Sequence, residues 1–375
     1  MQLSETVKLY PTENQKTLII QTMTEYIDTV NSLVSGAVNG HSIAKLTTAG
    51  VNADLPSALI NQCIRDAKSI VKKHYKSCHK AVLKNRNLAK RGSAIRTKAP
   101  NLPLLKKLCF YINNQNYKIK DDHIEFPVMI DGKSKRISVI VKQTDRQKAL
   151  FSDAKFGTMR IVIKSHTLVA QIVYEIAEPE LKTDGNVMGV DLGIKCPAVS
   201  YCSDGSVKFY GNGRKNKYIR RHYAYLHKKL QTSKKIKAVK RINDKEQRIM
   251  RDIDHKLSHD IVETAVAHNV KVIKLEQLSN VRSTTRKSRK NNHSLHTWSF
   301  YRLAQFIEYK AKLAGISVEY VNPAYTSQRC PVCGSVHHAD DRNYTCACGF
   351  HIHRDLLGAM NICNSTEFVG NRQTA

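Results

Sequence analysis

Residues 330–333 read Cys-Pro-Val-Cys, residues 346–348 read Cys-Ala-Cys, and Asp355 follows seven residues later. Two cysteine pairs that each close a tight turn are typical of a structural zinc site, in which four thiolates surround the ion at about 2.3 Å. We therefore predict that four residues bind Zn²⁺: Cys330, Cys333, Cys346 and Cys348. His351 and His353 lie nearby, but four cysteines already complete a tetrahedral shell.

The alternative is that these cysteines form two disulfides, as in a secreted protein. No apolar signal segment occupies the first ten residues, and no stretch approaches the ~20 apolar residues that span a bilayer. The other cysteines are scattered in apolar or mixed segments, as reduced cysteines usually are: Cys63, Cys78, Cys109, Cys196, Cys202 and Cys363. We expect a reduced, cytoplasmic protein with no membrane partner.

The charge of the chain indicates a polyanionic partner. Its 375 residues and 41% hydrophobic content suffice for two or three folded domains, but 61 Lys+Arg against 31 Asp+Glu give a net charge of +30. No acidic residue occurs between Gly205 and Asn243, where basic residues accumulate. Such a stretch repels itself unless phosphates neutralise it. We predict nucleic-acid contacts at Arg214, Lys215, Lys217, Arg220, Arg221, Lys228 and Lys229.

The apolar periodicity changes twice along the first half of the chain. Residues 1–10 alternate as a strand, and residues 12 to about 95 carry apolar side chains near the helical period of 3.6. From residue 101 the period becomes two, which predicts short strands around 108–112, 124–128, 137–141, 159–163 and 168–176. We expect a small antiparallel barrel, completed by the first strand, with the helical region inserted into it.

Three acids stand at the ends of predicted elements in the second half. An apolar strand over 187–194 contains Asp191, a second strand over 270–276 ends on Glu276, and Asp355 begins an apolar run. Phosphodiester cleavage by two Mg²⁺ ions requires carboxylates that hold the ions about 3.5–4 Å apart. Each acid alone could be a helix cap or a surface charge. Their order, with basic helices between the first two, favours a metal site.

Several of these segments together resemble the TnpB family, transposon-encoded proteins related to the type V CRISPR effectors. The similar segments are residues 8–15, 189–194, 255–258, 275–278, 323–334, 348–350 and 353–355. The resemblance implies an α/β fold plus a β-barrel. In that fold, a wedge-type barrel interrupted by a helical recognition lobe precedes an RNase H-like RuvC nuclease domain with an inserted zinc ribbon.

The family's organisation sets domain boundaries along the chain. It implies a first barrel strand at 1–10, a recognition lobe at 11–98 and the rest of the barrel at 99–182. The RuvC domain would then occupy 183–375, with the ribbon at about 327–350. The resemblance also assigns the catalytic, Mg²⁺-binding acids as Asp191, Glu276 and Asp355, and the structural zinc ligands as the four cysteines.

The implied activity is cleavage of DNA that matches a guide RNA and lies next to a short adjacent motif. The partners would be an RNA derived from the transposon end and double-stranded target DNA, and the protein would be a monomer associated with the prokaryotic nucleoid. Further backbone contacts are expected in the loop after Glu276, at Arg282, Arg286, Lys287, Arg289 and Lys290. Gln277 departs from the aspartate common in the family, and we expect it to affect metal affinity.

Two other functions remain open from the sequence. A guide-dependent repressor that does not cut would have lost one of the acids, and this chain retains all three. A guide-independent DNA-binding accessory of a transposase would carry no bound RNA. Two aromatic stripes are interpreted as core rather than as base-stacking surfaces. One is Tyr218 with Tyr225, and the other is an amphipathic helix that begins with Trp298, Phe300, Tyr301, Leu303, Phe306 and Ile307.

Overall fold

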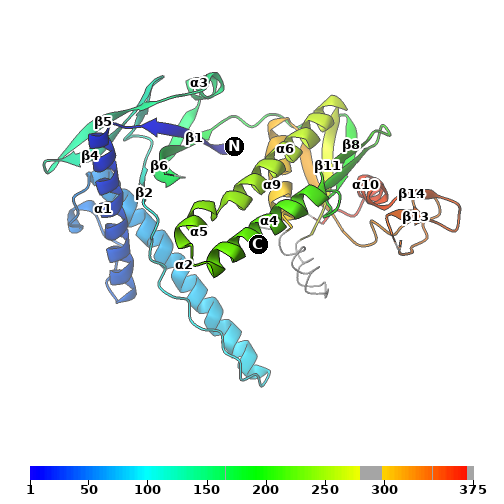
Figure 1. Ribbon diagram of the computed structural model, residues 1–375, viewed down its shortest axis with the longest axis horizontal. Coiled ribbons are helices and arrows are strands. Elements are labelled where there is room, and N and C mark those ends of the chain that lie inside the picture. The colour runs from blue at the N-terminus through cyan, green and yellow to red at the C-terminus, as the bar shows by residue number, and fades with distance from the viewer. Residues whose placement is uncertain (165, 279–297, 340, 370–375) are drawn as a thin grey trace. The chain divides into compact units, whose positions relative to one another are not determined.

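The computed structural model describes residues 1–164, 166–278, 298–339 and 341–369. The chain divides into two compact units, Met1–Ala177 and Glu178–Ala375, which are described separately (Figure 1). The finer division at residues 10, 98 and 182 stays a prediction. Within the described ranges, we find no helix with both the length and the apolar character that a membrane span requires.

Two long helices form one layer of the first unit. Helix α1 (Glu13–Val38) begins at Thr12, whose side chain accepts a hydrogen bond from Gln15 N–H while Gln15 bonds back to the Thr12 backbone. The short 3₁₀ turn η1 (Thr48–Gly50) leads to α2 (Ser57–Lys90). Both helices bury residues at intervals of three and four, so the helical region predicted from residue 12 is confirmed.

Seven strands form the sheet of this unit: β1 (Gln2–Tyr10), β2 (Cys109–Ile112), β3 (Lys118–Ile119), β4 (His123–Ile130), β5 (Lys133–Val141), β6 (Lys155–Lys164) and β7 (Thr167–Glu175). A short helix, α3 (Asp145–Ser152), joins β5 to β6. The strand order is β2-β6-β7-β1-β5-β4-β3, and every pairing is antiparallel. The strand from residues 1–10 therefore lies in the middle of the sheet.

The barrel predicted from the sequence is not closed. Strands β2 and β3 end the strand order, and the described residues show no pairing between them. Helix α1 packs against β2 and β4, and α2 packs against β2. Because these helices bury the apolar faces of the strands in one continuous core, burial does not require the sheet to close on itself.

The second unit contains a mixed sheet of five strands: β8 (Asn186–Asp191), β9 (Ala198–Cys202), β10 (Val207–Tyr210), β11 (Val270–Glu276) and β12 (Ser317–Val321). The order is β10-β9-β8-β11-β12. Strands β8, β11 and β12 are parallel, whereas β9 and β10 continue the sheet in antiparallel pairing. The carboxyl ends of the three parallel strands consequently meet at one edge.

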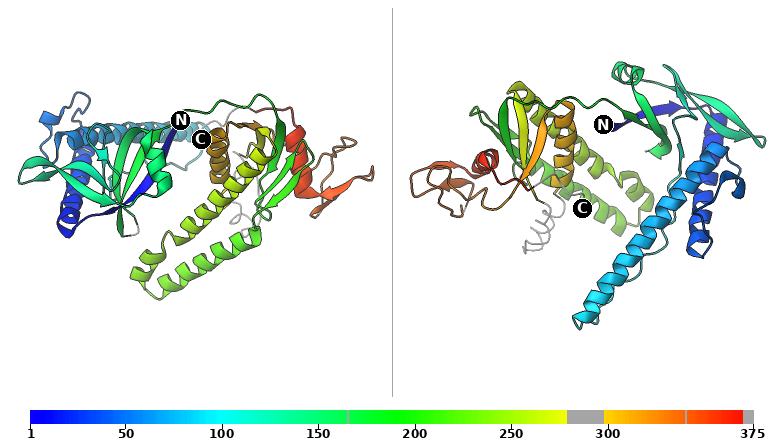
Figure 2. Two further views of the ribbon diagram at one scale, coloured as in Figure 1. Left: turned by 90° about the horizontal axis from the view of Figure 1, so that it is seen from above. Right: turned by 180° about the vertical axis from the view of Figure 1, so that it is seen from behind.

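Helices cover both faces of this sheet (Figure 2). Helices α6 (Lys245–Ala267) and α9 (Phe300–Leu313) bury their apolar faces with Met188 and Val190 of β8, and α10 (Arg354–Asn364) packs on the opposite face. Gly189 permits this close approach, because a Cβ atom there would lie 2.2 Å from Ala359 O. The missing side chain thus lets the α10 backbone contact β8 directly.

Helix α4 (Gly213–Thr232) and α5 (Ile236–Ile242) precede α6, and α4 runs back alongside it (Figure 2). Most α4 side chains are exposed, including Tyr218 at 68% and Tyr225 at 65%. The prediction that these tyrosines belong to the core is therefore wrong, because α4 packs mainly against α5 and α6, which leave the faces that carry Tyr218 and Tyr225 uncovered. The corresponding prediction for α9 is confirmed for Phe300, Leu303 and Ile307, which are buried, but it is wrong for Tyr301, whose side chain is 39% exposed.

Candidate metal centres

Two of the predicted catalytic acids are neighbours at the edge of the second sheet. Strands β8 and β11 pair in parallel with Val190 opposite Leu275, and each strand ends one residue later, at Asp191 and Glu276. The parallel register therefore brings two carboxylates, 85 residues apart in the sequence, to adjacent strand ends.

The third acid, Asp355, comes from α10, the helix that packs against β8. Asp355 lies in the first turn of α10, where its N–H donates to Nδ1 of the capping residue His353 at 3.3 Å. One turn further on, α10 passes so close to Asp191 that a Cβ on Gly358 would lie 3.1 Å from its Oδ2. The chain thus brings the predicted acids Asp191, Glu276 and Asp355 together around one strand edge.

Two of these carboxylates, Asp191 and Glu276, are hard to ionise where they lie. Burial, followed by the charges of Glu276 and Asp355, raises the pKa of Asp191 well above its ordinary value. Burial also raises the pKa of Glu276 to about 7, although a hydrogen bond from Thr326 Oγ1 to Glu276 opposes that shift. A bound cation would relieve this repulsion, so the site has the electrostatic character of a metal centre.

Arg342 supplies a positive charge beside the three acids. Its Nη1 lies 2.6 Å from Asp355 Oδ1 and 2.7 Å from Oδ2, and the Asp355 side chain is only 13% exposed. Arg342 also lowers the pKa of Asp191, although burial outweighs this effect. In this arrangement both oxygens of Asp355 bond to an arginine.

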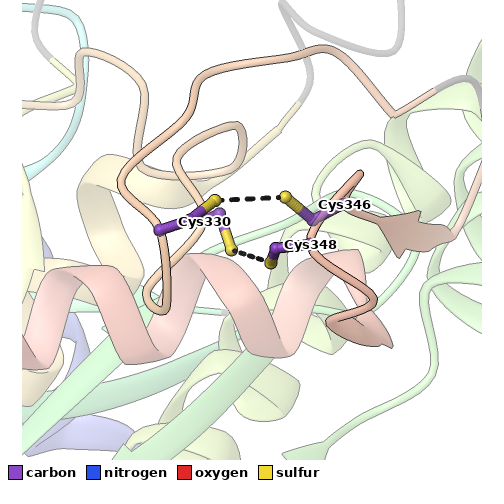
Figure 3. A group of neighbouring side chains, drawn as sticks. Cys330, Cys346 and Cys348 are labelled. Atoms are coloured by element: carbon purple, nitrogen blue, oxygen red, sulfur yellow. Dashed lines mark hydrogen bonds between the residues drawn. The ribbon is translucent and has the colours of Figure 1, made fainter.

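The four predicted zinc ligands converge in a separate cluster (Figure 3). Cys330 Sγ lies 3.7 Å from Cys348 Sγ, and Cys333 Sγ lies 3.4 Å from Cys346 Sγ. Four sulfurs at about 2.3 Å from a tetrahedral ion would be separated by about 3.8 Å. Within the described ranges, these cysteines are the one group with three or more candidate ligand atoms all within 4.8 Å of one another. They could therefore hold a zinc ion.

Two tight turns and one hydroxyl organise these thiols. Gly334 N–H donates to Cys330 O in the first turn, and Gly349 N–H donates to Cys346 O in the second, both at 3.0 Å. Ser335 Oγ lies 2.9 Å from Cys333 Sγ and 3.3 Å from Cys346 Sγ. Hydrogen bonding from Ser335 contributes most to lowering the pKa of Cys346 to about 5. A thiolate is the form that binds zinc.

The two centres are connected through the backbone. Strands β13 (Asn343–Thr345) and β14 (His351–His353) form a hairpin around the second cysteine pair, and β14 runs directly into α10. Arg354 N–H donates to Arg342 O at 2.7 Å. The small core of this segment includes Cys330, Cys346, the buried Tyr344 and Leu357 of α10. The segment that holds the cysteines therefore also fixes the start of α10.

The predicted nucleic-acid contacts form two groups in the sequence, one at residues 214–229 and one at residues 282–290. Most of the α4 residues are exposed: Arg214, Lys215, Lys217, Arg221, Lys228 and Lys229. Arg220 is the exception, because it is half-buried with its Nε 4.0 Å from Glu246 Oε1. The remaining predicted contacts lie outside the described residues: Arg282, Arg286, Lys287, Arg289 and Lys290.

A cleft adjoins the acids on the side of α4. It has a volume of about 450 Å³, and its charged lining residues are Asp355, Lys195, Arg214, Lys217 and Arg342. Phe209 and His353 form an aromatic part of its wall, with ring centroids 5.3 Å apart. The cleft is thus basic around a single acid.

Three residues around the centres were not assigned a role from the sequence. Thr326 belongs to a segment singled out as similar to the family, but its bond to Glu276 spans 50 residues. Arg342 and Ser335 belong to no recognisable sequence motif, because their contacts depend on the path of the cysteine-bearing segment. His351 and His353 remain outside the cysteine group, and His351 bonds to Thr345 instead.

Two family models match the second half of the chain. Residues 171–282 match the family OrfB IS605, described as a probable transposase, and residues 300–362 match the Cas12f1-like TNB domain. Together these regions contain all three acids and all four cysteines discussed above.

Curated proteins with similar sequences are likewise TnpB-like or Cas12f proteins. A TnpB-like protein of Methanocaldococcus jannaschii is 29% identical over 270 residues, which cover 68% of this chain and 95% of that protein. The CRISPR-associated endodeoxyribonuclease Cas12f1 of Syntrophomonas palmitatica is 25% identical over 347 residues, covering 85% and 67% of the two chains. Cas12f1 of Sulfoacidibacillus thermotolerans is 35% identical over 136 residues, or 34% of this chain and 30% of that protein.

Solved structures agree at the level of the fold. The structure of a Cas12f1–sgRNA–target DNA complex superposes with a TM-score of 0.63 at 16% identity, over 94% of this chain and 82% of that one. Cas12j bound to crRNA gives 0.57 at 10% identity, over 96% and 97%. The resemblance to TnpB is confirmed, and this chain is a relative of the TnpB-like and Cas12f proteins.

Proposed function

We propose that this protein is an RNA-guided DNA endonuclease that hydrolyses phosphodiester bonds of guide-matched DNA beside a short adjacent motif. The observation that carries the proposal is the grouping of Asp191, Glu276 and Asp355 around the edge of one sheet. The Cas12f relatives, which are named endodeoxyribonucleases, support it through matches that cover 34% and 85% of this chain. We further assign these acids to a RuvC-type, RNase H-like domain and the four cysteines to a zinc ribbon.

The acidic residues fit magnesium. Their donors are carboxylate oxygens, which Mg²⁺ prefers, and burial raises the pKa of both Asp191 and Glu276, with the charges of Glu276 and Asp355 adding to the shift of Asp191. Bound Mg²⁺ would lower the pKa of a coordinated water and stabilise charge on the phosphate. Asp191 and Glu276 would hold the ions from the strand ends, and Asp355 would complete the set from α10.

Neighbouring residues would orient these acids. Thr326 donates to Glu276 and is itself buried, so it holds that carboxylate in one direction. Arg342 neutralises Asp355 and lines the adjoining cleft, where a phosphate would compete for the guanidinium. Transfer of Arg342 from Asp355 to the substrate phosphate would leave both Asp355 oxygens available to metal.

The net charge of +30 and the exposed basic face of α4 support nucleic acid as the partner. A guided nuclease leaves sequence reading to base pairing and needs a basic channel that recognises backbone shape. We assign the α4 face to the phosphate backbone of the guide or of the guide–target heteroduplex.

The first experiment is to co-express the protein with its native flanking DNA and to sequence the RNA that purifies with it. A discrete RNA that ends in a segment from outside the element would support guided recognition. Random cellular RNA would overturn the guided part of the proposal and favour a general polyanion binder.

The second experiment tests cleavage. The purified RNA complex, supplied with Mg²⁺ and DNA matched to the RNA, should cut that DNA and spare an unmatched control. Asp191→Asn should bind the same DNA without cutting it. Guide-dependent binding without cleavage by the wild-type protein would instead identify a repressor.

A further inference from the structure

Lys274 is a charged residue on the face of the second sheet that α10 covers. It lies on β11 two residues before Glu276, so the pleat of the strand directs both side chains to the same face. Ile273 and Leu275 point to the other face, where they are buried in the core with α9. A half-buried lysine in this position needs hydrogen-bond partners, because an unpaired charge is costly away from water.

The C-terminal end of α10 supplies these partners. Lys274 Nζ donates to Cys363 O at 3.0 Å and to Ser365 O at 2.7 Å. Backbone oxygens at this end of a helix lack intrahelical donors, and the helix dipole is negative there. Helix α10 has no basic residue in its own last turn, and Ser365 is extended rather than left-handed. The lysine of β11 therefore takes the place of the usual C-terminal cap.

The same turn of α10 lies directly on β8. Gly189 is the partner of Lys274 in the parallel register, and a Cβ atom on Gly189 would lie 2.3 Å from Cys363 N. The Cys363 thiol lies 3.3 Å from Val187 O, which also belongs to β8. The last turn of α10 is thus held against both of the strands that carry the first two acids.

A displacement of α10 along its axis would move Asp355, which lies in the first turn of this helix, relative to the other two acids. Successive residues of an α-helix are about 1.5 Å apart along the axis. Mg²⁺ requires oxygen ligands at about 2.0–2.1 Å in nearly ideal octahedral geometry, whereas Ca²⁺ accepts longer and more variable distances. A shift smaller than one residue would therefore weaken the binding of Mg²⁺ more than that of Ca²⁺.

We propose that Lys274 is a positioning residue for the metal centre. It fixes the C-terminal end of α10 to β11 and thereby sets the position of Asp355 relative to Asp191 and Glu276. The cysteine-bearing hairpin fixes the opposite end of the helix. This inference rests on the proposed nuclease function, because it concerns the same three acids.

The main test compares two ions. Lys274→Met keeps an unbranched side chain but removes the charge and the donors. The RNA complexes of this variant and of the wild-type protein are titrated with Mg²⁺ and with Ca²⁺ by isothermal calorimetry, and the Asp191→Asn complex is the blank for ions that bind RNA. The variant should raise the Kd for Mg²⁺ roughly 10-fold, as expected for a residue that supports metal ligands. It should change the Kd for Ca²⁺ much less.

Matched variants separate positioning from general stability. Lys274→Arg keeps the charge and the donors and should retain a Kd for Mg²⁺ close to that of wild type. Lys274→Gln keeps an amide donor without the charge and should give an intermediate value. Lys271→Met removes another lysine of β11, which donates to Thr183 O at 3.1 Å rather than to α10, and should leave both Kd values unchanged. Zinc content should be the same in all four variants.

Amide hydrogen exchange gives a readout that does not depend on metal. Peptides from α10 should exchange faster in Lys274→Met, whereas peptides from the cysteine-bearing hairpin should keep their wild-type rates. An unchanged Kd for Mg²⁺ in Lys274→Met, beside a wild-type complex that binds the ion, would overturn this inference alone. A parallel loss of affinity for both ions, or unfolding of both Lys274→Met and Lys274→Gln, would also overturn it by giving Lys274 a general structural role. A wild-type complex that binds Mg²⁺ no better than the blank would overturn the proposed metal centre and this inference with it.

Discussion

At the scale of single residues, the acids that we propose for metal binding lower the stability of the metal-free protein. Asp191 and Glu276 are brought together by strand register, and burial with mutual repulsion raises the pKa of Asp191. A carboxyl whose pKa is higher in the folded state binds more protons there than in the unfolded chain. Its ionisation therefore reduces the free energy of unfolding as pH rises.

Asp191→Asn should accordingly make the metal-free protein more stable. We expect the free energy of unfolding to rise at pH 8, because the neutral amide places no charge in the buried position beside Glu276 and Asp355. The gain should shrink towards pH 3, below the ordinary aspartate pKa of about 3.9, where the carboxyl is largely protonated in both states. Thermal unfolding of the two proteins without metal, followed from about pH 3 to about pH 8, measures this difference. A variant less stable than wild type at every pH would contradict it.

Arg342→Ala should strengthen magnesium binding while weakening catalysis. Removal of the guanidinium leaves Asp355 without its ion pair and adds to the negative potential around Asp191. The Mg²⁺ concentration that gives half of the maximal thermal stabilisation should fall several-fold. Arg342→Lys, which keeps the charge, should remain close to wild type in this titration. A rise in that concentration for the alanine variant would show that Arg342 supports the metal site in another way.

The residues that sequence reasoning could find differ in kind from those it missed. Asp191, Glu276 and Asp355 were predicted because each stands at the end of a recognisable element. Thr326 and Arg342 act through contacts made only when distant segments meet. A lone threonine or arginine carries no periodicity, so its partner cannot be inferred from the sequence.

At the scale of elements, the cysteine-bearing hairpin serves as the foundation of α10. Strand β14 ends at His353, the capping residue of α10, and Leu357 of that helix packs into the same small core as Cys330 and Cys346. Binding of zinc would therefore contribute to positioning Asp355 as well as to folding the hairpin.

Cys346→Ala should lose zinc and cleavage together. Removing one of four thiolates opens the shell, and the disordered hairpin should release the start of α10. Zinc per chain, measured by atomic emission, and guided cleavage should both fall by more than 10-fold. Cys78→Ala, a cysteine outside the cluster, is the matched control. Normal cleavage by a zinc-free Cys346→Ala protein would separate the two centres.

Element types followed well from the sequence, while their surroundings did not. The helical region from residue 12 to about 95 and the alternating strands that follow it were predicted from period alone, since one face of each is buried. The burial of the α4 tyrosines was predicted wrongly because that prediction also relied on helical spacing alone. Helical spacing shows which residues share a face, but it does not show whether another element covers that face.

At the scale of the whole molecule, the charge of +30 is an extensive property that no single contact explains. It predicts strong, salt-dependent association with nucleic acid, because each neutralised phosphate releases condensed counterions. Length and composition indicated two or three folded domains, and the chain forms two compact units. The open sheet of the first unit was not, because closure depends on whether helices or other strands cover its ends.

Replacing Arg214 and Lys217 by alanine should reduce the salt dependence of RNA binding. The slope of log K against log salt concentration should become shallower by roughly 0.7–0.9 for each phosphate that the variant no longer neutralises. Fluorescence anisotropy with the co-purified RNA at several salt concentrations measures this slope. Lys256→Ala, which removes a surface lysine paired with Asp252, should leave it unchanged. Equal slopes in all three proteins would place the RNA elsewhere.

The placement of Asp355 on α10 also has a consequence for biosynthesis. A ribosome makes Asp191, then the basic helix α4, then Glu276, and only afterwards the cysteine-bearing hairpin and Asp355. A nascent chain that has just passed Glu276 can already attract nucleic acid, yet it lacks the third acid and the helix that presents it. Under the proposed function, the capacity to hold RNA would precede the capacity to cut in each molecule, and a guide would have time to bind before a complete centre exists.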